Sequence, residues 1–238
     1  MVQLVGFDGD DTLWHSEGYY QAAGEAFRTL LSRYVDLDEA HINDVLLSAE
    51  RRNLKLFGYG AKGMTLSMIE TAIEVTAERI SAADIHRIVA LGKEVLAHPV
   101  ELLPGIRTAV ESVAVRWPVV LITKGDLFHQ EAKIASSGLA DVFTRIEIVS
   151  EKNPECYARV LRECGAGAEG FVMVGNSLRS DIEPVVRLGG WGVHMPYHVT
   201  WAHELENGLQ PEHASRVVRV SRSEEIPGAV ARIAAVAA

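Results

Sequence analysis

The sequence predicts an α/β protein: a doubly wound parallel sheet into which an α-helical domain is inserted. A short apolar run at residues 4–7 is typical of a buried strand. From about residue 15 to residue 98, apolar residues recur only at helical spacing, and from residue 99 short β-branched runs alternate with helical stretches. We therefore expect a core domain of residues 1–14 and 99–238 and an inserted helical domain of residues 15–98.

Composition limits the class of protein. The chain has 238 residues, of which 48% are hydrophobic, and a formal charge of −9. The negative charge argues against a nucleic-acid partner, which needs a basic face. No apolar run has the length of a membrane helix, and no basic and apolar leader opens the chain, so we expect neither membrane contact nor secretion. Two cysteines, Cys156 and Cys164, make no disulfide framework, which favours a cytoplasmic location.

The inserted segment divides into four helical stretches. Apolar spacing of three and four predicts helices over residues 20–34, from residue 42 to about 57, and over residues 64–80. Gly58 and Gly60 separate the second from the third. Ser81 is placed to cap the fourth helix, with Asp84 in its first turn.

The rest of the chain alternates between helix and strand. Pro154 suits the first turn of a helix, and Gly138 suits the position just after one. The predicted strands are residues 119–122, 145–149, 171–174, 191–194 and 216–220. The predicted helices are residues 106–115, 127–136, a stretch beginning at 154, 180–188 and 227–236.

Acidic residues follow the first strand directly. Asp8 and Asp10 lie two residues apart in a turn, at the end of a strand where open α/β sheets bind ligands. Carboxylates this close repel each other, which favours a divalent cation or a shared proton. Hard oxygen ligands in small number suit Mg²⁺.

Polar residues also follow three later strands. Thr123 ends one strand, Lys152 lies just before the helix that begins at Pro154, and residues 175–181 read Gly-Asn-Ser-Leu-Arg-Ser-Asp after another. A hydroxyl such as that of Thr123 can donate to an oxygen whose charge grows in a transition state.

These four segments resemble the signatures of the haloacid dehalogenase-like (HAD) superfamily, in its phosphatase form Asp-x-Asp-x-Thr. The resemblance implies a Rossmann-like core with a helical cap, and a phosphatase that acts on a small phosphorylated metabolite. It makes Asp8 the nucleophile and Asp10 the general acid and base, with Thr123 and Lys152 on the phosphoryl group. It implies Mg²⁺ held by Asp8, Asp10 and Asp181. Asn176 stands where the family commonly has an acid, and it offers a neutral oxygen to the metal.

Several assignments stay open. Lys124 and Lys133 compete with Lys152, and Lys124 is also placed to bind phosphate. Trp14 and His15, at the junction with the inserted domain, are candidates for substrate binding or for packing. The residues from His194 to Glu204 are rich in histidine and aromatic side chains, and their role is undetermined.

Two other functions compete with the phosphatase. A 2-haloacid dehalogenase would need the nucleophilic aspartate but neither Asp10 nor a metal, and a non-catalytic phosphate-binding regulatory protein would explain Asn176. The protein is expected to be a monomer or a homodimer.

Overall fold

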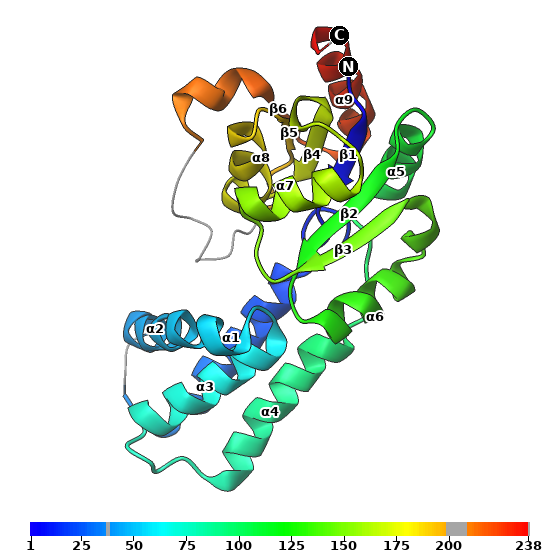
Figure 1. Cartoon of the computed structure of the whole chain (residues 1–238). Helices are drawn as coiled ribbons and strands as arrows, with labels where there is room; N and C mark the ends of the chain where they lie inside the picture. The colour runs from blue at the N-terminus through cyan, green and yellow to red at the C-terminus, as the bar shows by residue number, and fades with distance from the viewer. Residues whose placement is uncertain (37–38, 199–208, 238) are drawn as a thin grey trace. The chain divides into compact units, whose positions relative to one another are not determined.

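The structure is a computed structural model that describes residues 1–36, 39–198 and 209–237. Its contacts divide the chain into two compact units. The core unit comprises Met1–Glu17, Val100–Lys124 and Gln130–Ala238, and the helical unit comprises Gly18–Pro99 and Gly125–His129. Figure 1 labels the helices and strands of both units.

A six-stranded sheet forms the centre of the core unit, with the strand order β3-β2-β1-β4-β5-β6 and every neighbouring pair parallel. The strands are β1 (Leu4–Phe7), β2 (Val119–Lys124), β3 (Arg145–Val149), β4 (Phe171–Gly175), β5 (Trp191–His194) and β6 (Val217–Arg219). The order runs outward in both directions from β1, as it does in a doubly wound sheet. The predicted fold class is therefore confirmed.

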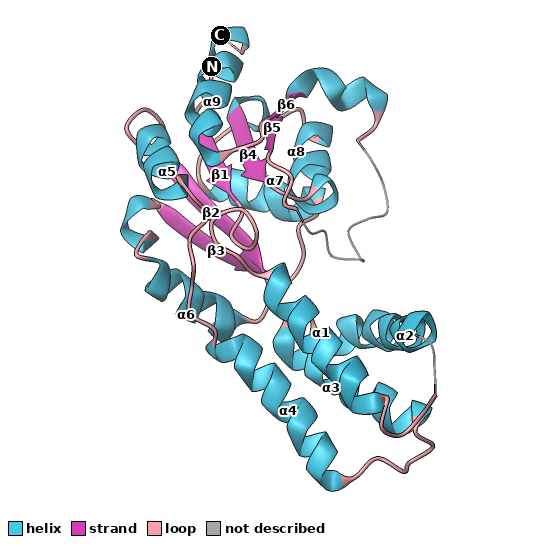
Figure 2. Cartoon of the chain, turned by 180° about the vertical axis from the view of Figure 1, so that it is seen from behind, coloured by secondary structure: helices cyan, strands magenta, loops and turns pink. Residues whose placement is uncertain are grey.

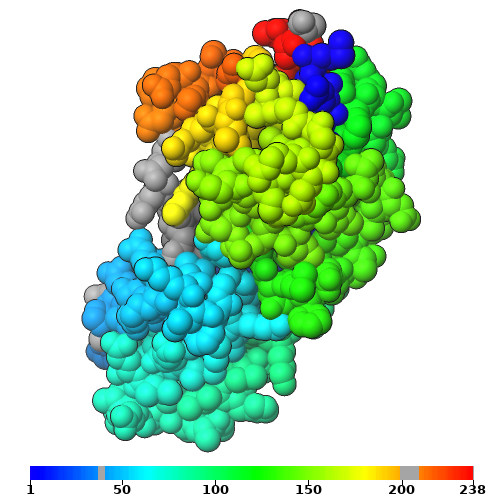
Figure 3. All heavy atoms as spheres, viewed as in Figure 1, coloured from blue at the N-terminus to red at the C-terminus, as the bar shows by residue number. Residues whose placement is uncertain are grey.

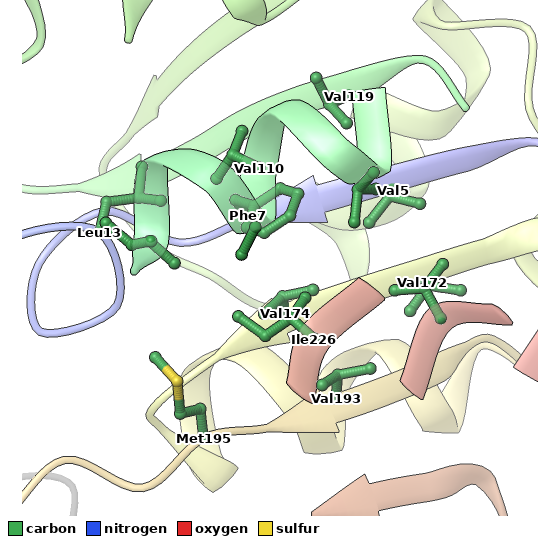
Figure 4. Close-up of a cluster of buried hydrophobic side chains, with 14 of the residues drawn as sticks. Val5, Phe7, Leu13, Val110, Val119, Val172, Val174, Val193, Met195 and Ile226 are labelled. Atoms are coloured by element: carbon green, nitrogen blue, oxygen red, sulfur yellow. The ribbon is translucent and has the colours of Figure 1, made fainter. Parts of the chain in front are cut away.

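Side chains alternate between the two faces of the sheet. On β4, Val172 and Val174 belong to the apolar cluster on one face, and Phe171 and Met173 belong to the cluster on the other. Figure 4 shows Val172 and Val174 on the first face, together with side chains of the helices that cover it. All four residues of β1 are buried, since helices cover both faces of a parallel sheet.

Helices α5 and α9 pack on one face of the sheet, while α7 and α8 pack on the other. The helices of the core sequence are α5 (Ile106–Ala114), α6 (Leu127–Ser137), α7 (Pro154–Glu163), α8 (Glu183–Arg187) and α9 (Ile226–Val236). Asn153 caps α7 by accepting from the amide of Cys156, and Pro154 occupies the first turn, as predicted. Gly138 follows α6 with φ 65°, a left-handed conformation that favours glycine.

One predicted helix of the core differs in form. Residues 180–188 were expected to be regular, but Leu178–Ile182 forms a π-helical turn, and α8 begins only at Glu183. The hydroxyl of Ser177 accepts from the amide of Ser180 and caps this turn. Such widened turns frequently occur at functional sites.

The helical unit is built from α1 (Glu17–Leu31), α2 (Glu39–Phe57), α3 (Ala61–Val75) and α4 (Ala82–Ala97). Figure 2 shows only helices and loops in its described residues. The helices share an apolar core of their own, centred on side chains such as Phe27, Met68 and Ile88. Ser81 caps α4 as predicted, by accepting from the amide of Asp84. The third helix is shorter than expected: it ends at Val75 because the chain turns there through Ala77 and Glu78, both at positive φ.

The two ends of the described chain lie side by side in the core unit. The amino group of Met1 donates to the carbonyl oxygen of Ala237, and Figure 3 shows the first residues in blue against the red C-terminal helix. Within the described ranges, no helix combines the length and the apolar character that crossing a membrane requires.

Candidate active site

Three charged side chains meet at the carboxyl edge of the sheet. Asp8 follows β1, Lys152 follows β3, and Asp181 lies in the π-helical turn after β4. The ammonium of Lys152 donates to Oδ1 of Asp8 and, at 2.7 Å, to Oδ1 of Asp181. The three residues are 6%, 4% and 1% exposed, so this ion cluster is removed from water. The sheet thus brings together residues that lie far apart in the sequence.

The charges in this cluster do not balance, because two carboxylates face one ammonium. Burial, and then repulsion from Asp181, raise the pKa of Asp8 to about 7, although the Lys152 ammonium acts in the opposite direction. Burial alone would lower the pKa of Lys152, but Asp181 and Asp8 raise it well above its ordinary value. The lysine is therefore held as a cation, and the cluster keeps an excess of negative charge.

Thr12 connects Asp8 to the segment after β4. Its hydroxyl donates to Oδ2 of Asp8 at 3.0 Å and accepts from the backbone amide of Asn176 at 3.1 Å. The side-chain oxygen of Asn176 lies 3.3 Å from the same hydroxyl. Thr12 is fully buried, so it fixes the orientation of the Asp8 carboxylate.

The hydroxyl of Thr123 is a buried donor with no partner. Thr123 is 1% exposed, and its Oγ1 makes no hydrogen bond within the described part of the chain. A Cβ at Gly9 would lie 3.0 Å from this oxygen, so glycine keeps the space beside it open. Because buried polar groups are nearly always paired, this hydroxyl fits a ligand that supplies an acceptor.

Asp10 lies in a separate environment from Asp8. Its carboxylate accepts from the indole of Trp14 at 2.6 Å, from the amide of Gln130 at 2.9 Å, and from the ammonium of Lys133 at 2.5 and 2.7 Å. Burial would raise the pKa of Asp10, but the charge and hydrogen bonds of Lys133, with those of Gln130 and Trp14, lower it below its ordinary value. Asp10 is therefore held as a carboxylate.

Asp11, the acid next to Asp10, has a local structural role. Asp11 accepts from the backbone amides of Ser16 at 2.8 Å and Glu17 at 3.1 Å, so it satisfies amides at the beginning of α1. Burial, and then the charge of Asp10, raise the pKa of Asp11 to about 7.

Trp14 and His15, predicted as substrate contacts, have protein partners in the structure. Trp14 is fully buried beside Asp10, and His15 Nδ1 lies 2.6 Å from the hydroxyl of Tyr197. The segment that begins at His194 thus contacts the end of the first motif. Residues 199–204 of that segment lie outside the described residues. Substrate binding by Trp14 and His15 stays a prediction.

The lysines that compete with Lys152 contact other groups. Lys124 donates to the hydroxyl of Ser180 at 2.8 Å, and Lys133 binds Asp10. In the described structure it is Lys152 that contacts Asp8.

The sequence patterns leave three residues of this region without an assigned role. Thr12 is the threonine of the Asp-x-Asp-x-Thr motif, but the motif assigns no role to it. The sequence offers Lys133 only as a competitor of Lys152, and no pattern points to Gln130. Both are on α6, and their contact with Asp10 depends on which face that helix turns toward the first motif.

The oxygen atoms at this edge fit a hard divalent cation. Asp8 and Asp181 supply carboxylates, and each carboxylate oxygen keeps a lone pair beyond its hydrogen bond. The backbone carbonyl of Asp10 and the amide of Asn176 would add neutral oxygens. No group of three or more His, Cys, Asp or Glu suited to a metal occurs among residues 1–36, 39–198 and 209–237. This donor set, with excess negative charge and few carboxylates, suits Mg²⁺.

The fold and this cluster define a hydrolase of the haloacid dehalogenase-like class. The family model for haloacid dehalogenase-like hydrolases matches residues 2–189, and the chain belongs to this family. It is similar to a haloacid dehalogenase-like family hydrolase from Xanthomonas campestris, with 55% identity and a TM-score of 0.87 over 99% of this chain and 93% of that one.

More distant structures share the fold. A 2-haloacid dehalogenase from Pseudomonas syringae has 20% identity and a TM-score of 0.63, over 98% of this chain and 99% of that one. A putative HAD hydrolase from Bacillus subtilis, bound to magnesium, has 16% identity and a TM-score of 0.61, over 96% of this chain and 98% of that one. Comparison with curated protein sequences gives no match.

Proposed function

We propose that this hydrolase is a Mg²⁺-dependent phosphatase that cleaves a small phosphomonoester through an aspartyl-phosphate on Asp8. One observation carries the proposal: the site has two carboxylates at the first motif, and each has its own lysine. Asp8 lies in a buried ion cluster with Lys152 and Asp181, and Asp10 is bound by Lys133. A dehalogenase needs the first carboxylate but not the second.

The chemistry has two steps. A carboxylate oxygen of Asp8 attacks phosphorus, the ester P–O bond breaks, and Asp10 gives its proton to the departing oxygen. Water then attacks the phosphorus of the aspartyl-phosphate, Asp10 takes the proton from that water, and the bond from phosphorus to Asp8 breaks to release inorganic phosphate. The donors around Asp10 favour its carboxylate form, which the second step requires, and oppose its protonated form, which the first step requires. The proton that Asp10 takes from water in the second step is the proton that it gives to the departing oxygen in the next cycle.

Other residues of the site supply binding and charge. The ammonium of Lys152 offsets the repulsion between the Asp8 carboxylate and an anionic substrate. The unpartnered hydroxyl of Thr123 would donate to a phosphoryl oxygen. Lys124 is the next residue in the sequence and is also placed to bind phosphate. Mg²⁺, when bound by Asp8, Asp181, the Asp10 carbonyl and Asn176, would neutralise charge on the transferring group.

The helical unit is proposed to act as a cap that excludes water from the reaction. Its closure over the motif residues, and its motion relative to the core unit, stay predictions. The cytoplasmic location, the monomeric or homodimeric state and the absence of a nucleic-acid partner stay predictions as well.

Turnover of 4-nitrophenyl phosphate and of glycerol 2-phosphate, with Mg²⁺ and after chelation, tests the proposal. Asp8→Asn should reduce both activities to background, because no aspartyl-phosphate forms. Asp10→Asn should lose roughly 10²–10⁴-fold on the alkyl ester, whose leaving group needs a proton, and less on the aryl ester in the first step. A burst of nitrophenolate followed by slow turnover is expected, since the base is missing in the second step.

Controls separate the competing functions. Asp141→Asn changes an exposed carboxylate of the core unit and should leave both activities unchanged. Chloride release from 2-chloropropionate without metal, in the absence of phosphate release, would instead identify a dehalogenase. Binding of phosphate with no turnover of any ester would identify a non-catalytic protein. Full activity in Asp8→Asn would contradict the proposed nucleophile.

A further inference from the structure

Helix α6 carries two polar side chains that are buried against Asp10. Lys133 is 7% exposed and Gln130 is 2% exposed, and they lie one helical turn apart. Lys133 contacts both oxygens of the Asp10 carboxylate, across 123 residues of sequence. A lysine this deeply buried is expected only with a partner for its charge, and Asp10 is that partner.

The contacts fix the carboxylate from more than one side. Trp14 donates to Oδ1 at 2.6 Å, and Gln130 donates to Oδ2 at 2.9 Å. The same amide of Gln130 lies 3.1 Å from the backbone oxygen of Lys124, at the end of β2. The position of the Asp10 carboxylate is therefore linked to the strand end that carries the unpartnered hydroxyl of Thr123.

Lys133 and Lys152 serve different carboxylates. Lys152 contacts Asp8 and Asp181, whereas Lys133 contacts Asp10. Asp8 and Asp10 are near enough for their charges to repel. With Lys133 absent, that repulsion would be uncompensated at Asp10, and the carboxylate would lose the contact that holds both of its oxygens.

We propose that Lys133, supported by Gln130, is a positioning residue that holds Asp10 in the orientation needed for proton transfer. This inference rests on the proposed phosphatase function. Lys133 touches no reacting atom in it, and the whole effect of Lys133 on turnover passes through Asp10. A displacement of about 1 Å at a reacting group can reduce a rate by about 10²-fold, so the effect is measurable.

A double-mutant cycle tests the inference with Lys133→Met, Asp10→Asn and the combined variant, each measured on 4-nitrophenyl phosphate and glycerol 2-phosphate. Lys133→Met should lower kcat on the alkyl ester by about 10²-fold and on the aryl ester by a smaller factor, with KM changed by less than about twofold. In the Asp10→Asn background, Lys133→Met should cause no further loss on either ester. Lys133→Arg keeps the charge and should retain more activity than Lys133→Met.

Glu131→Gln is the matched control, since Glu131 is exposed on the same helix and should leave activity unchanged. If Lys133→Met does not fold, Lys133→Arg still gives the comparison, because it keeps the buried charge pair but changes how the Asp10 carboxylate is held, so its loss of kcat should be larger on the alkyl ester than on the aryl ester. The inference would be overturned if Lys133→Met lowered kcat by the same factor on the two esters. It would also be overturned if Lys133→Met lowered kcat equally in the wild-type and the Asp10→Asn background. A wild-type enzyme that releases phosphate from neither ester would instead refute the phosphatase function, and the inference with it.

Discussion

Lys152→Met removes the one cation from the buried ion cluster and should destabilise the protein strongly. In the native protein the ammonium lies between Asp8 and Asp181, whose side chains are 9% and 1% exposed. Removal of one partner from a buried ion pair costs about 3–5 kcal/mol in free energy of unfolding. Methionine has nearly the length of lysine, so little of this loss comes from a cavity.

The cluster charge explains how the loss should respond to a second substitution. The native cluster holds two acids and one ammonium, and Lys152→Met leaves the two acids without a cation, so the pKa of Asp8, which Lys152 lowers, should rise further. Asp181→Asn in the Lys152→Met background removes the repulsion between the two acids. Most of the lost stability should therefore return in the double variant, without the lysine.

Urea denaturation at pH 7.5, followed by circular dichroism and tryptophan fluorescence, measures these differences. Lys93→Met, at an exposed position of α4, is the control and should change the free energy of unfolding by less than about 0.5 kcal/mol. Millimolar Mg²⁺ should recover part of the stability of Lys152→Met, because a bound cation replaces the missing charge. A loss below about 1 kcal/mol, or an equal loss in the single and double variants, would contradict the role of Lys152 as the buried counter-ion.

Three further predictions concern neighbouring acids and the metal. Asp11→Ala should reduce the free energy of unfolding by about 1 kcal/mol, because the first amides of α1 lose their acceptor, while Asp11→Asn should keep most of that stability in urea denaturation. Asp8 has a pKa raised from 3.8 to about 7 in the folded protein, so its stabilising contribution is present below pH 3.8 and is lost as the pH rises through 7. Carboxyl NMR titration should report this pKa, Mg²⁺ should lower it, and a folded-state value near 4 without metal would contradict the excess negative charge. Asn176→Asp should tighten Mg²⁺ binding by about 10- to 100-fold in isothermal titration calorimetry, and unchanged affinity would exclude residue 176 from the metal site.

Much of the sheet could be predicted because its strands are short, β-branched and buried on both faces. The run from Phe171 to Val174 is apolar throughout, and it becomes β4 with its end one residue further on. Glycine, proline and serine marked helix ends where a specific backbone geometry or a cap is needed, as at Gly138, Pro154 and Ser81. The end of the third helix escaped prediction because no glycine or proline marks the turn through Ala77 and Glu78.

The candidate site could be predicted only where its residues directly follow strands. Parallel strands end at one edge, and the resemblance to the HAD superfamily implied which strands are neighbours, so Asp8, Thr123 and Asp181 could be assigned to the same region. Lys133 and Gln130 escaped this reasoning because they project from a helix, and the face that α6 turns toward Asp10 depends on tertiary packing. A lysine in a helix is expected at the surface, because lysine is rarely buried without a partner for its charge.

The strand order also determines when the molecule can fold as it is synthesised. β1 is made first, but its residue Val5 pairs with Val119 on one side and Val172 on the other. At roughly 5–20 residues per second, the ribosome needs roughly 6–23 s to make the intervening residues before the first of these partners exists. The apolar core of the helical unit draws all its members from residues 20–96, so every one of them is synthesised before β2. The segment of β1 is therefore apolar and unpaired in the nascent chain at a stage when all the residues of the helical unit's apolar core have been synthesised.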